Sequence, residues 1–154
     1  MSDLYNVAVR RYLTSGVAWE SEGNNYQMLL FKQGASGPTF NATHTTVAAV
    51  LADEDNTECN DASYSREAIA HTNRSITNTA RKTQAHIDAA IDFGALDNEE
   101  VGGALLFLYI DTTDADNIPI AFLTSTDFPV QTNGAGFEIN DGASGLFEAE
   151  GVSV

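Results

Sequence analysis

The chain has 154 residues, of which 43% are hydrophobic, and a single domain of this length buries roughly two-thirds of its surface. Twenty-two acidic residues stand against seven lysines and arginines, so the formal net charge is -15. A surface with this charge repels nucleic acid and anionic lipid, which excludes both as expected partners.

Cys59 is the only cysteine, which excludes an internal disulfide framework and a cysteine-based zinc site. It lies in the acidic segment DEDNTECND (53–61), whose charges would raise the pKa of a thiol and make it a poor nucleophile. The longest apolar run, VGGALLFLYI (101–110), is about half a membrane span. No basic and apolar leader opens the sequence, so we expect synthesis in the cytoplasm without export.

The first predicted element is a short helix over about residues 5–15, which Gly16 could end in a left-handed conformation. The apolar positions that share one side at helical spacing are Val9, Tyr12, Leu13 and Val17. Arg10 and Arg11 lie off that side. Trp19, just beyond the helix, is expected in the core.

A strand is predicted over Tyr26–Lys32, and its near-continuous apolar character indicates burial on both faces or coverage by the helix. Thr45 or Thr46 could cap a second short helix around 47–51. The acidic segment 53–61 has few apolar residues and is predicted to be an exposed loop.

Two candidate strands follow, SYSREAIAHT (63–72) and RSITNTARK (74–82), separated by a turn. The next segment, AHIDAAIDFGAL (85–96), alternates between apolar and polar residues and predicts one strand. Its apolar face would carry Ile87, Ala89, Ile91 and Phe93.

The most hydrophobic predicted strand, GGALLFLYID (102–111), is expected at the centre of the sheet. A turn rich in Asp and Asn and a strand with Pro119 near its start come next. The chain then ends in a predicted hairpin that pairs a strand around Phe137 with one around Phe147, with Glu138, Glu148 and Glu150 facing solvent. Short strands with turn signals between them predict one mainly β domain over 1–154, an antiparallel sandwich or barrel-like fold with two short helices.

No enzyme signature is present: the sequence lacks a nucleophile elbow, a zinc-protease motif, and the phosphate-binding and dinucleotide-binding glycine patterns. The glycines of NGAGFE (133–138) and DGASGLF (141–147) are typical of turns. We therefore expect a protein that is not an enzyme and has no cofactor.

Metal binding is also weakly supported. His44, His71 and His86 lie in different predicted elements, and each is expected to be a polar surface residue. His86 and Asp88 share a strand face and could together hold an ion weakly. The acidic turns do not have EF-hand spacing, so solvated turns are favoured over calcium sites, which remain the alternative.

In chain order, the segments VAWESEGNNYQMLLFK (17–32), AHIDAAIDFGAL (85–96), GGALLFLYIDTTDADNIPIAFLTSTD (102–127) and GAGFEINDGASGLFEAE (134–150) resemble a family of small tailed-bacteriophage virion proteins. Members of this family are often encoded near the major capsid protein. The resemblance rests on element order and loose consensus, and no catalytic motif comes with it.

The resemblance implies a capsid decoration (cement) protein on the outer surface of the virion. Such a protein binds the major capsid protein and copies of itself, in some cases as a homotrimer, and stabilises the shell. Its candidate contacts to an acidic neighbour are Arg10, Arg11, Arg74, Arg81 and Lys82. For these residues, ordinary solvated charge or intramolecular pairing is favoured over such contacts, because exposed pairs contribute little. The alternative functions are a tail or neck component (tube, terminator or baseplate) and a β-sandwich module that binds carbohydrate or the host surface.

Overall fold

The computed structural model describes residues 2–14, 19–78, 82–124, 127–142 and 145–150. Within these ranges the elements, in chain order, are β1 (Ser2–Leu4), α1 (Asn6–Thr14), β2 (Asn25–Lys32), α2 (Val47–Leu51), β3 (Glu67–Ile69), a 3-10 turn (His71–Asn73), β4 (Arg74–Asn78), β5 (Lys82–Ile87), β6 (Ile91–Tyr109), β7 (Ile118–Leu123), β8 (Val130–Ile139) and β9 (Phe147–Glu150). The protein is mainly β, with antiparallel sheets and two short α-helices among the described residues, which confirms the predicted fold class.

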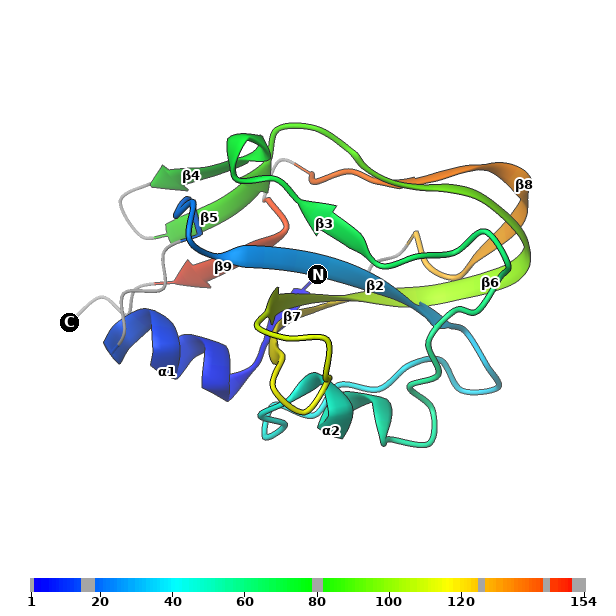
Figure 1. Cartoon of the computed structure of the whole chain (residues 1–154), viewed down its shortest axis with the longest axis horizontal. Coiled ribbons are helices and arrows are strands. Elements are labelled where there is room, and N and C mark those ends of the chain that lie inside the picture. Colours follow the sequence, from blue (N-terminus) through cyan, green and yellow to red (C-terminus); the bar gives the residue numbers. More distant parts are fainter. Residues whose placement is uncertain (1, 15–18, 79–81, 125–126, 143–144, 151–154) are drawn as a thin grey trace.

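Strand β6 organises the molecule (Figure 1). The larger sheet has the order β1-β7-β6-β2-β3, and β8 joins it by pairing with β6. The first half of β6 pairs with β8, and its second half lies between β2 and β7. The smaller sheet has the order β4-β5-β9. This one strand of 19 residues therefore has β8 as its partner in its first half, and β2 and β7 as its partners in its second half.

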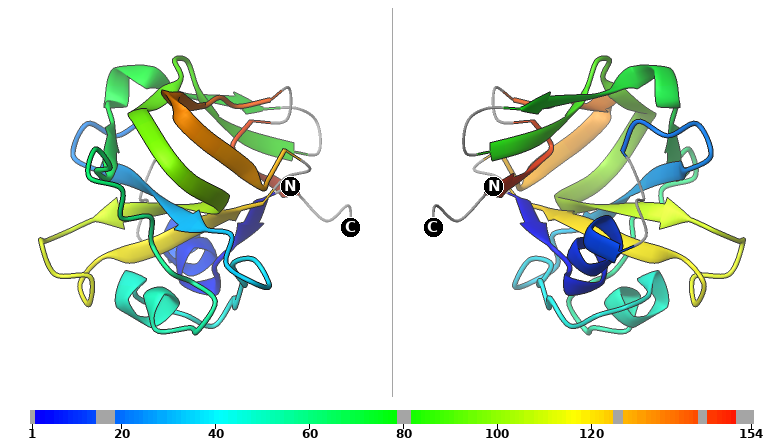
Figure 2. Two further views of the ribbon diagram at one scale, coloured as in Figure 1. Left: turned by 90° about the vertical axis from the view of Figure 1, so that its right-hand side faces the viewer. Right: turned by 90° about the vertical axis from the view of Figure 1, so that its left-hand side faces the viewer.

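The central strands are buried on both faces because they lie between two layers (Figure 2). Helices α1 and α2 cover one side, and the β8 ribbon with the smaller sheet covers the other. All residues of 101–108 and all of β7 are buried. This arrangement explains why the predicted strands at Tyr26–Lys32 and 102–111 have almost continuous apolar sequences instead of alternating ones.

Helix α1 confirms the prediction for 5–15, but Val9 does not lie on its buried side as predicted. Tyr5 and Ala8 are buried, whereas the Val9 side chain is 41% exposed. Just before the helix, Tyr5 donates its backbone N–H to the carbonyl of Ile120 and packs its ring edge-on against Phe40. The side chains of Tyr12 and Leu13, together with Gly16 and Val17, lie outside the described residues.

Helix α2 is capped as predicted. The Thr46 hydroxyl accepts a hydrogen bond of 3.2 Å from the backbone N–H of Ala49. Val47 and Val50 are buried in the core, and their packing together with the cap stabilises this five-residue helix.

The predicted strand over 85–96 is wrong, since the chain turns between β5 and β6. Ala89 is exposed at that turn, while Ile87 and Ile91 are buried on either side of it. The turn is held by long-range bonds: the Trp19 indole N–H donates to the carbonyl of His86 at 3.0 Å, and Asp88 donates its backbone N–H to Asn73.

The predicted terminal hairpin is also wrong. Strand β8 pairs with β6, and β9 pairs with β5, so the two strands belong to different sheets. Strand β8 (Val130–Ile139) runs through the segment 133–138, whose glycines are typical of a turn. Phe137 and Ile139 pack against the core, Phe147 is buried and Glu138 is exposed, in agreement with the predicted facing. The side chains of Glu148, Ala149 and Glu150 lie outside the described residues.

Candidate partner-binding surface

The contacts of each lysine and arginine side chain decide whether that residue could bind an acidic partner. Lys32 pairs with Glu99 at 3.2 Å and donates to Asn60, so its charge is used within the fold. Arg66 and Arg74 are also used internally, in two different ways. Of the two arginines of α1, Arg10 is exposed and Arg11 is half-buried.

Arg66 binds two carboxylates with both sides of its guanidinium group. Its Nε and Nη2 donate to Glu58 at 2.8 and 2.7 Å, and its Nη1 and Nη2 donate to Asp114 at 2.5 and 2.9 Å. Its Cζ lies 5.6 Å from the centre of the Phe107 ring. The hydrogen bond from Arg66 lowers the pKa of Asp114 below its ordinary value. Arg66 therefore connects the acidic segment 53–61 and the loop after β6 to the central sheet.

Sequence reasoning did not identify Arg66 as important. The signal was available, because Arg66 is one of only seven cations and has acidic segments before and after it in the chain. Which carboxylates it would bind could not be read from the sequence, since Asp114 lies 48 residues away.

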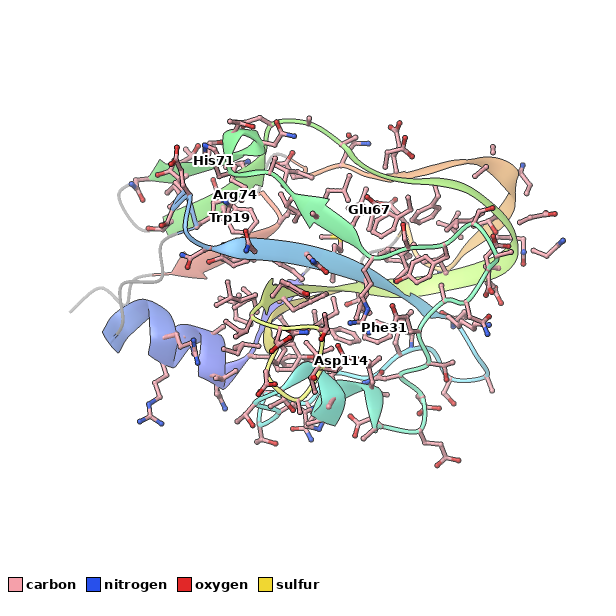
Figure 3. All side chains as sticks on the ribbon, viewed as in Figure 1. Trp19, Phe31, Glu67, His71, Arg74 and Asp114 are labelled. Carbon is pink, nitrogen blue, oxygen red and sulfur yellow. The ribbon has the colours of Figure 1, made fainter. Side chains whose placement is uncertain are left out.

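Arg74 is buried and cannot serve as an exposed contact, which corrects its inclusion among the candidate contact residues. Only 5% of the residue is exposed, and its Cζ lies 5.6 Å from the Trp19 ring and 4.9 Å from the Tyr26 ring. Figure 3 shows Arg74 next to Trp19 at the end of the molecule that carries β4 and β5. Trp19 itself is 1% exposed, which confirms that it is a core residue. The guanidinium group stacks on aromatic rings here and so takes part in the core.

The α1 surface, which we define as Val9, Arg10 and Arg11, carries the two other candidate contact residues whose side chains are described. Val9 and Arg10 are exposed, and Arg11 is half-buried. No carboxylate among the described residues forms an ion pair with Arg11. Of the other two candidates, Arg81 lies outside the described residues, and Lys82 begins β5 with a side chain that is not described.

All three histidines are partnered by carboxylates, and two of them are more buried than expected. His44 pairs with Asp53 at 3.6 Å, and His71 pairs with Glu22 at 3.2 Å. His86 does not pair with Asp88: its Nδ1 lies 2.7 Å from Asp141, and Asp88 accepts a hydrogen bond from Ser75 instead. The side chains of His44 and His86 are only 14% and 19% exposed.

The acidic turns use their oxygens within the fold. Asn117 is buried, and its side-chain oxygen accepts the backbone N–H groups of Ile110 and Asp111 at 2.8 and 3.1 Å. Asp111 binds Thr112, and Asp114 binds Arg66. The described part of the chain holds no group of three His, Cys, Asp or Glu side chains arranged to ligate a metal ion.

The segment 53–61 is more than the exposed loop that its composition predicts. Asn56 is 1% exposed; it accepts from the backbone N–H of Thr39 and donates to the carbonyls of Thr39 and Val50. Cys59 is 3% exposed and donates its backbone N–H to Leu30. The pKa of the Cys59 thiol is raised to about 12, chiefly by burial and secondarily by neighbouring charge, so the predicted direction is right but its main cause is burial.

Exposed apolar side chains are few. Among the described residues, the large hydrophobic side chains that are exposed are Val9 and Ile110. Every described aromatic side chain is buried or half-buried. At the outer edge of β4, the Glu20 carboxylate accepts the backbone N–H of Ile76 at 3.1 Å. This surface favours contacts through charge over contacts through a broad apolar patch.

Neither α-helix in the described ranges has the length and apolar character needed to cross a bilayer. Comparison of the chain with protein-family models, with curated proteins and with solved structures gave no match.

Proposed function

We propose that this protein is a structural component of a bacteriophage virion, a capsid decoration (cement) protein that binds the major capsid protein between capsomers on the outer face of the head. The resemblance of its segments to small virion proteins supports this role. So does the folded state, which is a mainly β unit. In this role the protein is made in the host cytoplasm and carries no cofactor.

The observation that carries the proposal is the location of cationic charge. Arg10 and Arg11 are adjacent cations beside the exposed Val9 on α1. A molecule with a net charge of -15 stays soluble and avoids DNA, and two adjacent cations on one helix would complement an acidic neighbour. We therefore assign the α1 surface as the contact to the capsid.

Co-sedimentation tests the proposal. Purified protein is mixed with phage heads that lack it and, separately, with free capsid subunits, and the pelleted protein is quantified. We expect saturable binding to heads and none to free subunits, because the binding site is formed between assembled capsomers. Failure to pellet with heads at any protein concentration would rule out decoration.

A pair of variants then tests the α1 surface. Arg10→Gln with Arg11→Gln should weaken head binding several-fold, with a smaller difference at high salt, because exposed charges are screened. The control is Ala35→Glu with Ser36→Glu, which changes the net charge by the same amount at two exposed positions. If both double variants bind heads as the wild type does, decoration stands and the assignment of α1 is wrong.

The alternatives are distinguished by the same samples. A tail-tube, terminator or baseplate protein would form rings in solution, visible by electron microscopy. A carbohydrate-binding module would require exposed aromatic side chains, and no described aromatic side chain is exposed. Binding to a glycan array without binding to heads would favour that alternative.

A further inference from the structure

The segment Asn133–Gly134 on β8 has an unusual combination of chemistry and geometry. It is the only place in the chain where glycine follows asparagine. Both residues are exposed, and Gly134 has a φ of 82°, a left-handed conformation that glycine adopts without strain. A β-carbon placed on Gly134 would meet no atom closer than Asp97 Oδ1 at 4.0 Å. Glycine has no side chain that could shield its backbone nitrogen, and the space around Gly134 is open.

The side-chain amide of Asn133 is hydrogen-bonded to the backbone of its own strand. The side-chain Oδ1 of Asn133 accepts a hydrogen bond of 3.2 Å from the backbone N–H of Ala135. This bond holds the Asn133 side chain against the backbone two residues further along. It also places an N–H donor at the oxygen where negative charge develops when a nucleophile attacks Cγ, which is how an oxyanion is stabilised.

We propose that Asn133 is a site of spontaneous deamidation in the folded protein. The backbone nitrogen of Gly134 loses its proton to solvent base and forms a bond to Cγ of Asn133. The Cγ–Nδ2 bond then breaks, and the side-chain nitrogen leaves as ammonia. Water opens the resulting five-membered succinimide at either carbonyl to give aspartate or isoaspartate. One water is consumed, one ammonia is released and no redox change occurs.

The product would weaken the ribbon formed by β6 and β8. Asn133 lies opposite Asp97 in the strand register, so the new carboxylate faces an existing one, and like charges directly opposite each other destabilise a strand pair. Isoaspartate also lengthens the backbone by one carbon within β8. The ribbon already has register shifts on both sides of Asp97, so it has few regular bonds with which to absorb this change.

Asn41 provides a matched comparison within the same molecule. It is exposed, and its Oδ1 accepts the backbone N–H of Thr43 at 3.1 Å, as Asn133 does with Ala135. The next residue, however, is Ala42, whose methyl group hinders attack by its own nitrogen. Asn56 and Asn117 are buried and hydrogen-bonded, and serve as unreactive references.

The test is peptide mapping by mass spectrometry after the native full chain is incubated in mildly alkaline buffer, with enzymatic methylation of isoaspartate as a second readout. We expect the Asn133 peptide to acquire the mass change of –NH2 to –OH and to become methylated, faster at higher pH, while the Asn41 peptide stays unchanged. A parallel sample unfolded in urea gives the rate for a chain without structure. Modification of Asn133 in urea but not in the native protein would overturn the proposal, as would equal rates at Asn133 and Asn41.

Two variants test the site and its consequence. Asn133→Gln should remove the methylation signal, because closure to a six-membered ring is much slower. Asn133→Asp reproduces one product and should unfold at a lower temperature than Asn133→Gln. A midpoint for Asn133→Asp equal to or above that of Asn133→Gln would contradict the weakening of the ribbon.

Discussion

Arg66 shows how a single side chain can determine the arrangement of several segments. Its guanidinium group binds Glu58 and Asp114, which approach it from different loops, and it lies over the ring of Phe107. The side chains of Arg66, Glu58 and Asp114 are each about a quarter exposed, so water only partly screens the charges. Two-sided bidentate binding of this kind needs the planar fork of arginine.

We expect Arg66→Met to lower the free energy of unfolding by about 2 kcal/mol, because it leaves two partly buried carboxylates beside each other without a cation. Arg66→Lys should recover part of the loss, since it restores the charge but not the fork. Urea unfolding measures both. A loss for Arg66→Met no larger than that for the exposed control Arg10→Met would contradict this role.

The same pair makes a prediction about pH. Folding lowers the pKa of Asp114 below its ordinary value of 3.8, so the native state binds this proton less readily than the unfolded chain. The stabilisation is therefore fully present above pH 3.8 and is lost as the pH falls through the lowered pKa of the folded state. The stability difference between wild type and Arg66→Met should shrink over that acidic range.

At the scale of elements, the loop after β2 packs directly on the backbone of β6. A β-carbon on Gly102 would lie 2.6 Å from Gln33 Oε1, 2.7 Å from the Cα of Gln33 and 2.8 Å from the Cδ of Pro38. Two of these atoms cannot move without moving the loop backbone or a proline ring. Glycine is therefore required at this crossing because the two chain segments approach too closely for any side chain.

Gly102→Ala should lower the free energy of unfolding by about 1–3 kcal/mol, the usual range for added volume in a packed site. Gly136→Ala is the matched control, since a β-carbon there would meet nothing within 4 Å and its φ is not positive. That variant should be neutral or slightly stabilising. Similar thermal shifts for the two variants would show that the loop is not tightly packed on β6.

At the scale of the whole molecule, the excess of negative charge opposes the compact state. With a net charge of -15, most exposed carboxylates have no cation to pair with, and their mutual repulsion is relieved when the chain unfolds. A few attractive clusters, with Arg66 as the best placed, act against this repulsion. Ionic strength affects both, but the long-range repulsion between exposed charges is screened more effectively than the partly buried pairs.

We therefore expect the midpoint of thermal unfolding to rise as sodium chloride is added from low to physiological concentrations. Scanning calorimetry at several salt concentrations measures the shift, and potassium chloride is the control that separates screening from specific ion binding. A falling midpoint would mean that the attractive pairs contribute more than the repulsion does.

Local signals determined several features correctly. The mainly β class, the helix near 5–15, the Thr46 cap and the central position of 102–111 all follow from short-range periodicity, capping chemistry and apolar runs. The burial of Trp19 follows from its residue type. These features depend on neighbours within a few residues, which a sequence displays directly.

Strand partners and the destinations of charged side chains were decided by tertiary structure. Strand β8 could pair with β6 or with β9, and the glycines in its middle are typical of a turn, so the sequence allowed the hairpin that the fold does not form. The same holds for Arg74. Its charge predicts a position on the surface, but in the folded protein it is buried against the rings of Trp19 and Tyr26. In each case the deciding contacts join residues far apart in the chain, and their energies depend on burial and geometry that exist only after the layers have packed.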